Sequence, residues 1–187
     1  MKKVLCLLLM LSTWFATSAQ EITLNENGAY EKKTVVLVEN TSAAVLFGRA
    51  MEALSDWTGA DGRSKAGIDF SDKDAGTVIY KGTYFLGFKK TLLGAGWNRY
   101  ADFTLKVRCK DGKAQVTAIV SSITGIYNTN GMKKSYTIRE VVDITQSSKG
   151  KKKERREEFV SDIITTADAL VAAMSERIKG SANDDDF

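Results

Sequence analysis

The dipeptide Asp111-Gly112, which separates two alternating apolar runs, is the feature that most constrains how this chain can fold. Aspartate followed by glycine favours a two-residue type I′ turn, because both central residues of that turn need a positive φ. A turn here places apolar residues opposite one another on one face: Cys109 with Ala114, Val107 with Val116, Leu105 with Ala118 and Phe103 with Val120. A slip of one residue would expose this whole set to water. The sequence therefore predicts an antiparallel hairpin over 103–120, with Cys109 on its buried face.

The segments around this hairpin predict further strands and two helices. We expect strands over 34–39, 68–70, 77–88 and 136–144, the first well covered by other structure and the third bent at Gly82. A helix is expected from the capping residues 40–42 to about Trp57. Apolar residues recur at helical spacing near the end of the chain: Val160, Ile163, Ile164, Ala167, Leu170, Val171, Met174 and Ile178.

The predicted fold class is α+β, because the apolar stripe of the last helix needs the apolar face of a sheet to cover. We expect an antiparallel sheet of about five to six strands, one helix after the first strand, and a long C-terminal helix packed on one face. The alternative is a helix-grip arrangement, in which the sheet and the long helix enclose a cavity.

The first 19 residues have the three parts of a secretory signal. Lys2 and Lys3 are followed by a short apolar run over 4–15, and the small residues Thr17 and Ala19 precede a cleavage point. The run is too short to span a bilayer as a helix. We therefore expect a signal peptide over 1–19 and no transmembrane segment after its removal. The mature chain would be exported, to the periplasm or to the extracellular side of the cell surface.

Beyond the signal, the chain is predicted to form a single α+β domain over 20–180 with an acidic disordered tail over 181–187. Loss of Lys2 and Lys3 lowers the formal charge from +4, so the basic balance is weak support for a nucleic-acid partner, and none is predicted.

The chain contains no histidine, which removes the usual general base near neutral pH and the commonest zinc ligand. Ser, Lys and carboxylates remain, but no nucleophile, phosphate-binding or metal-ligand motif accompanies them. We therefore predict no catalytic residues, no metal site, no cofactor and no enzymatic activity.

A glycine-rich apolar segment over 86–97 is the most unusual part of the sequence. Leu92, Leu93 and Trp97 alternate with glycines in a predicted loop between strands. If these side chains are exposed, they form an apolar patch that binds a partner or ligand. The alternative is that the loop folds back and caps one end of the core.

Three further segments could be functional sites, but we favour an ordinary structural role for each. Asp69, Asp72 and their neighbours resemble a calcium loop but lack the glutamate at its twelfth position, so a polar turn is preferred. Glu140 falls on the apolar face of the predicted strand over 136–144, where an edge strand or a bulge explains it. The basic stretch 149–156 could bind acidic lipids or polymers, but a solvated lead-in to the last helix is preferred.

Several motifs resemble a known family: the signal peptide with the segment 34–57, then D-A-G-T-V-I-Y-K-G-T at 74–83 and F-T-L-K-V-R-C-K-D-G-K at 103–113. They are similar to an exported family of Bacteroidota, a domain of unknown function with a TATA-binding-protein-like fold. The resemblance covers roughly 30–124 and implies a curved antiparallel sheet with helices on one side. It implies no catalytic residues, and a fold name by itself does not imply DNA binding.

The sequence thus favours a non-catalytic module of the cell envelope that binds an unknown envelope protein or a ligand. Two alternatives stay open: a carrier for an apolar small molecule, and a hydrolase whose residues form no recognised motif.

Overall fold

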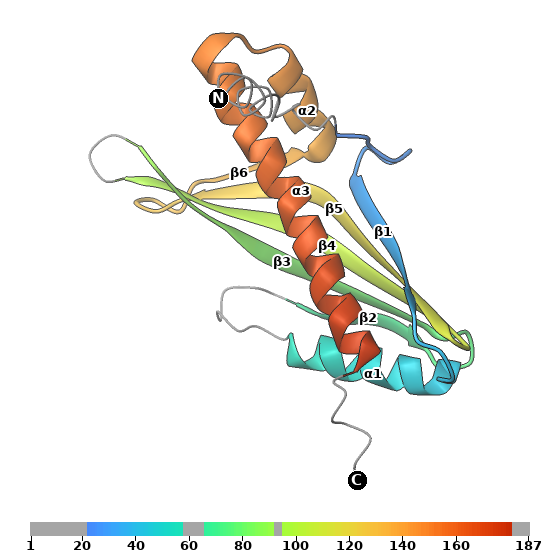
Figure 1. Ribbon diagram of the computed structural model, residues 1–187. Coiled ribbons are helices and arrows are strands. Elements are labelled where there is room, and N and C mark those ends of the chain that lie inside the picture. Colours follow the sequence, from blue (N-terminus) through green and yellow to red (C-terminus); the bar gives the residue numbers. More distant parts are fainter. Residues whose placement is uncertain (1–21, 58–65, 92–94, 181–187) are drawn as a thin grey trace, which may run out of the picture.

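The computed structural model describes residues 22–57, 66–91 and 95–180. In chain order the elements are β1 (Tyr30–Leu37), α1 (Ala43–Asp56), β2 (Gly67–Asp72), β3 (Thr77–Lys90), β4 (Gly96–Lys110), β5 (Lys113–Tyr127), β6 (Lys133–Thr137), α2 (Ile138–Gln146) and α3 (Gly150–Lys179). Figure 1 shows that α3 runs obliquely across the strands of the sheet. The predicted α+β class, with an antiparallel sheet and a long C-terminal helix, is confirmed.

The sheet is antiparallel, and different strands pair at its two ends. At one end the strand order is β1-β5-β4-β3-β2, and β6 pairs with the far part of β5. We call the end that contains the Asp111-Gly112 turn the proximal half. The distal half comprises residues 84–90 of β3, 96–101 of β4, 122–127 of β5, and β6.

The predicted hairpin is confirmed, with all four apolar pairs in the expected register. The predicted type I′ turn was wrong, because Gly112 has a positive φ of 74° but Asp111 does not. Leu105, Val107, Val116 and Ala118 are fully buried. Asp111 does more than form the turn, because its carboxylate accepts a hydrogen bond from the Ala43 amide at 2.8 Å. The turn of the hairpin thereby also holds the first turn of α1 against the proximal end of the sheet.

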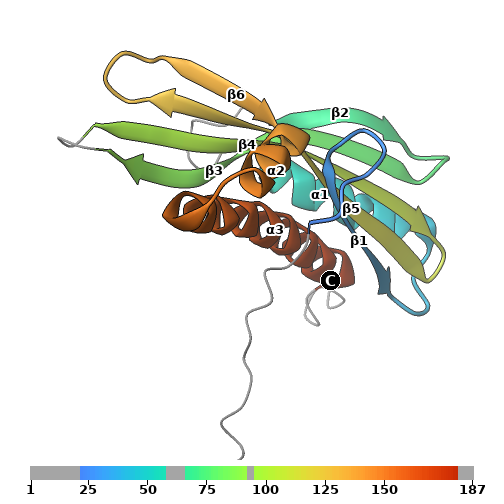
Figure 2. The same cartoon turned by 90° about the horizontal axis from the view of Figure 1, so that it is seen from above.

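Both long helices, α1 and α3, lie on one face of the sheet, and no described helix covers the other face (Figure 2). The predicted first helix is confirmed: Ser42 caps α1 by accepting a hydrogen bond from the Val45 amide, and the helix buries Leu46, Ala50 and Leu54. The predicted stripe of α3 is buried over its whole length, from Val160 to Ile178. The core therefore lies between the proximal strands and these two helices.

Cys109 is buried in this core, as predicted. Desolvation by burial raises the pKa of its thiol to about 11. The thiol is thus held in its neutral, unreactive form near neutral pH.

One prediction for the early strands was wrong. The first strand is an edge strand, with Val35 and Leu37 exposed, because β5 is its neighbour on one side only and no described helix covers its outer face. The predicted bend of β3 at Gly82 stays a prediction, while the pairing with β4 keeps its register through Gly82. A Cβ at Gly82 would lie 2.9 Å from the Phe103 ring, so glycine there makes room for that ring.

The predicted strand over 136–144 was also wrong. β6 ends at Thr137, which caps α2 in a reciprocal capping box with Glu140. Glu140 is therefore neither an inward-facing strand carboxylate nor a bulge residue. Hydrogen bonds donated by the backbone and side chain of Thr137 lower the pKa of its carboxyl group. The basic stretch 149–156 is likewise not a lead-in, since α3 begins at Gly150 and includes most of it.

Candidate functional site

Two of the three predicted binding residues, Leu92 and Leu93, lie outside the described residues. Trp97 lies in β4 and not in a loop, since β3 extends to Lys90 and β4 begins at Gly96. Its side chain is half-buried on the distal half of the sheet. The prediction that these three residues bind a partner remains a prediction, while the position of Trp97 directs attention to the surface around it.

Two single-residue bulges decide which side chains share the face of Trp97. Leu86 is an extra residue in β3, and Ser121 is an extra residue in β5, each opposite an unbroken stretch of β4. A bulge reverses the alternation of side chains beyond it. Lys89 and Tyr127 therefore lie on the same face as Trp97, the face that carries the helices.

Next to Trp97, two of the residues that pair across the sheet are glycines and have no side chain. Arg99 pairs with Gly125 on one side and Gly87 on the other, and Lys134 pairs with Gly125 from β6. A Cβ at Gly87 would meet no atom within 4 Å, which is open space. Because Gly87 and Gly125 have no side chains, the surface of the sheet is depressed on both sides of Arg99. We call this the low region.

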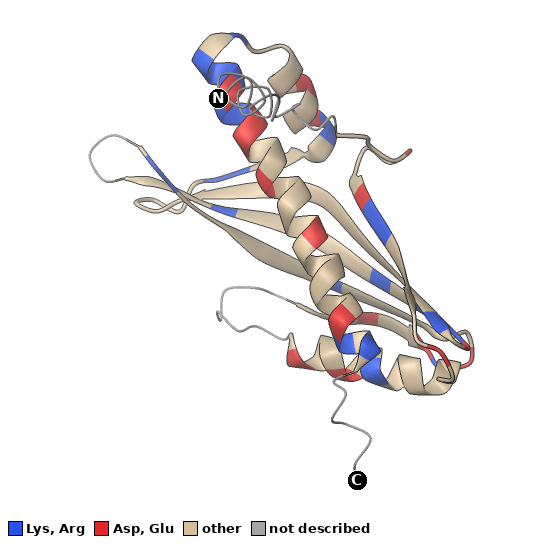
Figure 3. Cartoon of the chain, in the orientation of Figure 1, with Lys and Arg blue, Asp and Glu red and all other residues tan. Residues whose placement is uncertain are grey.

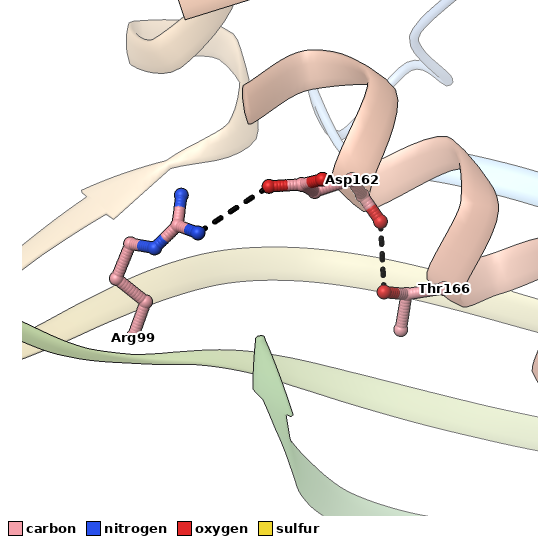
Figure 4. Close-up of polar contacts among 3 residues, drawn as sticks. All are labelled: Arg99, Asp162 and Thr166. Carbon is pink, nitrogen blue, oxygen red and sulfur yellow. Dashed lines mark hydrogen bonds and ion pairs between the residues drawn. The ribbon is translucent and has the colours of Figure 1, made fainter. Parts of the chain in front are cut away.

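The first turns of α3 pass above this low region and meet Arg99. The guanidinium of Arg99 lies 4.9 Å from the centre of the Phe159 ring and donates to Asp162 Oδ2 at 3.4 Å (Figure 4). Thr166 donates to the backbone carbonyl of Asp162 at 2.8 Å, one turn further along the helix. Arg99 Nε is buried and has no hydrogen-bond partner among the described residues. A guanidinium has five N–H donors, and the contact with Asp162 uses only one nitrogen of Arg99.

A groove of about 610 Å³ opens between β3, β4 and α3 at this place. Its lining consists of six basic residues and one aromatic residue: Lys89, Arg99, Lys151, Lys152, Arg155, Arg156 and Phe159. We call it the cationic groove. Among the described residues, no carboxylate forms an ion pair with Lys89, Lys151, Lys152 or Arg155, although Asp162 contacts Arg99.

The start of α3 is poorly suited to helix stability. Lys149 occupies the capping position without a side-chain hydrogen bond, and the first turn contains no acidic residue. Lysines there add positive charge to the positive end of the helix dipole, which is unfavourable. Such an arrangement favours an anion that neutralises both the side chains and the helix end.

Arg156 differs from the other groove residues because it also has a structural role. It donates to the backbone carbonyl of Ile144 at 2.6 Å and to the hydroxyl of Ser148. These bonds join the end of α2 to α3, and they hold the basic first turns of α3 over the distal strands.

Basic and acidic residues are separated along the molecule. Residues 84–101 and 123–137 contain five Lys or Arg and no Asp or Glu, and residues 149–156 contain six Lys or Arg and one Glu. Together these segments hold 11 of the 27 basic residues but only one of the 23 acidic ones. Figure 3 shows blue segments at the start of α3 and on the strand ends toward it. The modest net charge of +4 therefore hides a strongly basic distal half.

The other candidates from the sequence do not join this site. Asp72 accepts a hydrogen bond from the Ala75 amide at 2.9 Å, as expected for a polar turn. The residues with assigned positions contain no group of three or more metal-ligating side chains. Among the helices in that part of the chain, none combines the length and the apolar character needed to cross a bilayer.

The comparisons with known proteins agree with the fold. Residues 33–122 match the sequence model of a family described as "Domain of unknown function (DUF4468) with TBP-like fold". A crystal structure of a DUF4468 family protein from Bacteroides ovatus ATCC 8483 aligns with a TM-score of 0.66 and 15% identity, over 89% of this chain and 94% of that one. A TBP-like protein from Parabacteroides distasonis ATCC 8503 aligns with a TM-score of 0.65 and 18% identity, over 86% and 99%. A search of curated protein sequences found no match.

Proposed function

Because the chain belongs to the DUF4468 family with a TBP-like fold, whose description assigns no function, we propose a function from the site itself: the protein binds a polyanionic ligand in the cationic groove. The observation that carries this proposal is the lining of the groove, in which six basic side chains surround about 610 Å³ of space. The resemblance predicted from the sequence is confirmed by the family match, and it contributes the fold alone.

The electrostatics of the groove support an anionic occupant. Like charges in close proximity repel one another, and the Lys-rich start of α3 adds to this cost. A ligand with several phosphate, sulfate or carboxylate groups would offset that repulsion at many points. Arg99 and Arg155 can each bind such a group with two parallel hydrogen bonds.

This proposal keeps the predicted non-catalytic binding module and makes its ligand a polyanion. The sequence suggested an apolar binding patch at Leu92, Leu93 and Trp97 and, as an alternative, a cavity for an apolar ligand between the sheet and the long helix. The groove beside Trp97 is instead lined mainly by cations. Binding without covalent chemistry needs only these side chains. The apolar carrier and the hydrolase are the competing proposals. A second groove, of about 580 Å³ between α1 and the end of α3, contains Glu52 and Glu176 beside basic residues, so it does not suit an apolar ligand. We prefer the cationic groove because its charged lining residues all have the same sign.

Export is part of the proposal, since residues 1–19 have the composition of a secretory signal. A ligand outside the cytoplasm is then expected. The intact mass of the protein from its native envelope checks this point: cleavage after Ala19 supports export, and an uncleaved chain in the cytosol contradicts it.

The test of the groove compares two charge reversals of equal size. The double variant Lys152→Glu/Arg155→Glu changes the groove, and the control Lys110→Glu/Lys113→Glu changes two exposed lysines beside the Asp111-Gly112 turn. Fluorescence anisotropy would follow labelled dextran sulfate and labelled polyphosphate at low and at high salt. We expect the groove variant to bind at least about tenfold more weakly at low salt, and the control to change binding by less than about twofold.

Equal losses in the two variants would mean that the polyanions respond only to net charge, and the proposal would be wrong. Tight binding by the groove variant would contradict it as well. Urea unfolding of both variants, with circular dichroism as the readout, checks that each one folds.

A further inference from the structure

We infer that the polyanion is an acidic polysaccharide, and that one of its sugar rings packs against Trp97 while its anionic groups enter the cationic groove. The inference rests on the proposed function and names the ligand class of the same site. It depends on how the indole ring lies on the sheet, on what surrounds it, and on its position next to the groove.

The indole of Trp97 lies over a position that has no side chain. A Cβ at Gly125, on the neighbouring strand, would lie 3.0 Å from Cε3 of the indole. Any other residue at position 125 would therefore lift or displace the ring. Glycine lets one side of the indole approach the backbone of β5, while the side chain as a whole stays only half-buried. The ring thus forms a rigid platform on the surface of the sheet.

The residues around the platform are aromatic and basic. Tyr127 packs beside Trp97 with 5.0 Å between ring centroids, and Lys134 Nζ lies 5.7 Å from the centre of the indole ring. Tyr127 fixes the orientation of the indole by packing against it. Lys134 extends from β6, and its ammonium lies over the indole ring. A sugar that packs on Trp97 therefore displaces this flexible side chain, whose charge can then pair with an anionic group of the ligand.

The platform and the groove form one continuous surface. Lys89 pairs directly with Trp97 across β3 and β4, so their side chains lie on the same face. Arg99 lies two residues along β4 from Trp97 and therefore also shares that face. Lys89 and Arg99 both line the groove. A ligand that packs on the indole must consequently place its neighbouring groups among the basic residues.

This combination fits a charged sugar polymer better than the other polyanions. The C–H groups of a pyranose face carry partial positive charge and pack against the electron-rich face of an aromatic ring. Polyphosphate has no ring to place on Trp97. Single-stranded nucleic acid stacks successive bases on a series of aromatic platforms. Here the rings of Trp97 and Tyr127 are tilted by 52°, and the Phe159 ring is covered by the Arg99 guanidinium. One platform flanked by cations therefore favours one sugar ring flanked by anionic groups.

The experiment measures affinities of the full chain for four probes: dextran sulfate, polygalacturonate, polyphosphate and single-stranded DNA, at matched charge and salt. We expect Trp97→Ala to weaken binding of the two polysaccharides about five- to fiftyfold, in line with aromatic contacts of this kind, and Trp97→Phe to restore part of the loss. Binding of polyphosphate should change by less than about twofold. Phe88→Ala is the matched control, because Phe88 is an exposed aromatic residue on the same hairpin and pairs with Asn98 on the opposite face.

A spectroscopic readout separates direct contact from an indirect effect. In the variant Trp14→Phe/Trp57→Phe, Trp97 is the remaining tryptophan. Its emission should shift to shorter wavelength when polygalacturonate binds, and it should not shift with polyphosphate. An equal loss of all four probes in Trp97→Ala, or an unchanged emission spectrum, would overturn the inference but leave the groove as an anion site. Tighter, Trp97-dependent binding of DNA would replace the polysaccharide with nucleic acid. If no probe binds in a salt-dependent manner, the proposed function itself is wrong.

Discussion

The proximal and distal halves of the sheet contain the same three long strands but are built for different purposes. In the proximal half, the helix-facing side chains of β3, β4 and β5 are buried, among them Val78, Leu105 and Val116. In the distal half, the equivalent positions are Lys89, Arg99 and Gly125, which are half-buried or exposed. The proximal half is covered by α1 and most of α3, whereas the basic first turns of α3 cross the distal half.

This difference shows how one sheet can separate stability from binding. Apolar burial near the Asp111-Gly112 turn supplies the driving force for folding. The distal strands contribute fewer buried side chains, among them Ala101 and Ile123, and depend more on continuity of the backbone and on ladder hydrogen bonds. Their outer residues, such as Lys89 and Trp97, are available for a ligand. The four predictions below test that division, beginning with the largest effect.

Loss of a buried side chain should separate the two halves most clearly. Leu105→Ala removes a fully buried side chain from the proximal half, and we expect the free energy of unfolding to fall by about 2–5 kcal/mol. Ile126→Ala, at a half-buried position of the distal half, should cost well under half of that. Urea unfolding of both variants gives the comparison. Equal losses would mean that the distal half is as much a part of the core as the proximal half.

Glycine replacement should show the same asymmetry. Gly76 has a φ of 59°, and a Cβ there would lie 2.5 Å from the Cys109 carbonyl oxygen. Gly76→Ala should therefore lower the free energy of unfolding by about 1–3 kcal/mol or more, from backbone strain and from this clash. Gly87 also has a positive φ, 104°, but a Cβ there meets no atom within 4 Å. We expect Gly87→Ala to be less destabilising in thermal unfolding, and the reverse order would refute the comparison.

The cap of α2 connects the distal strands to the rest of the fold. Thr137→Ala breaks the reciprocal capping box and should cost about 1 kcal/mol, more than Ser42→Ala, whose single cap bond to the Val45 amide is 3.4 Å long. The pKa of Glu140 is lowered in the folded protein, so its contribution is present above the ordinary pKa of the carboxyl group. That contribution is lost as the pH falls through the folded-state value. Unfolding of wild type and Thr137→Ala from pH 7 to pH 3 should show their difference shrinking, and a constant difference would contradict this role.

The smallest expected change is a gain in stability, whereas the variants above lose stability. Lys152→Glu places an acidic residue in the first turn of α3, and we expect it to stabilise the protein by about 0.3–1 kcal/mol while it weakens polyanion binding. Lys179→Glu, at the proximal end of the same helix, should destabilise by a similar amount. A stabilised variant that binds less tightly would show that the distal half is maintained at a cost to stability. Thermal unfolding and anisotropy on the same samples measure both quantities.

Much of the proximal half could be predicted from the sequence because local signals there agree with tertiary packing. Asp111-Gly112 determined the hairpin register, and residues 40–42 marked the start of α1. The apolar stripe from Val160 to Ile178 identified the last helix. In each case the spacing of apolar residues matched the face that is buried.

The segment after β6 was misassigned although it contained a signal. Ile138, Val142 and Ile144 alternate as in a strand, but Thr137 and Glu140 have the spacing of a capping box. Ile138, Val141, Val142 and Thr145 are the residues that α2 buries, and they also fit a helical repeat. The capping pair was the more specific of the two patterns.

The site itself was largely hidden from sequence reasoning. Its basic residues come from β3, β4 and α3, and Lys89 and Arg155 are separated by 66 positions. A run of Lys and Arg over 149–156 was visible, but it is usually only solvated. The informative signal was the absence of acidic residues from 84–101 and 123–137, which becomes meaningful once the sheet brings those segments together.

The bulges at Leu86 and Ser121 reverse, between the proximal and the distal half, which alternate side chains of β3 and β5 face the helices. Even-numbered residues of β3 and β5 face the helices before each bulge, and odd-numbered residues face them afterwards. If the same residues alternated regularly, with no bulge, Phe88 and Ile126 would face the helices where Lys89 and Tyr127 now do. Each bulge therefore decides which of two alternating sets of side chains the distal half presents beside α3. A substitution that abolished a bulge without changing the length of the chain would replace a basic or polar side chain of the binding surface by an apolar one.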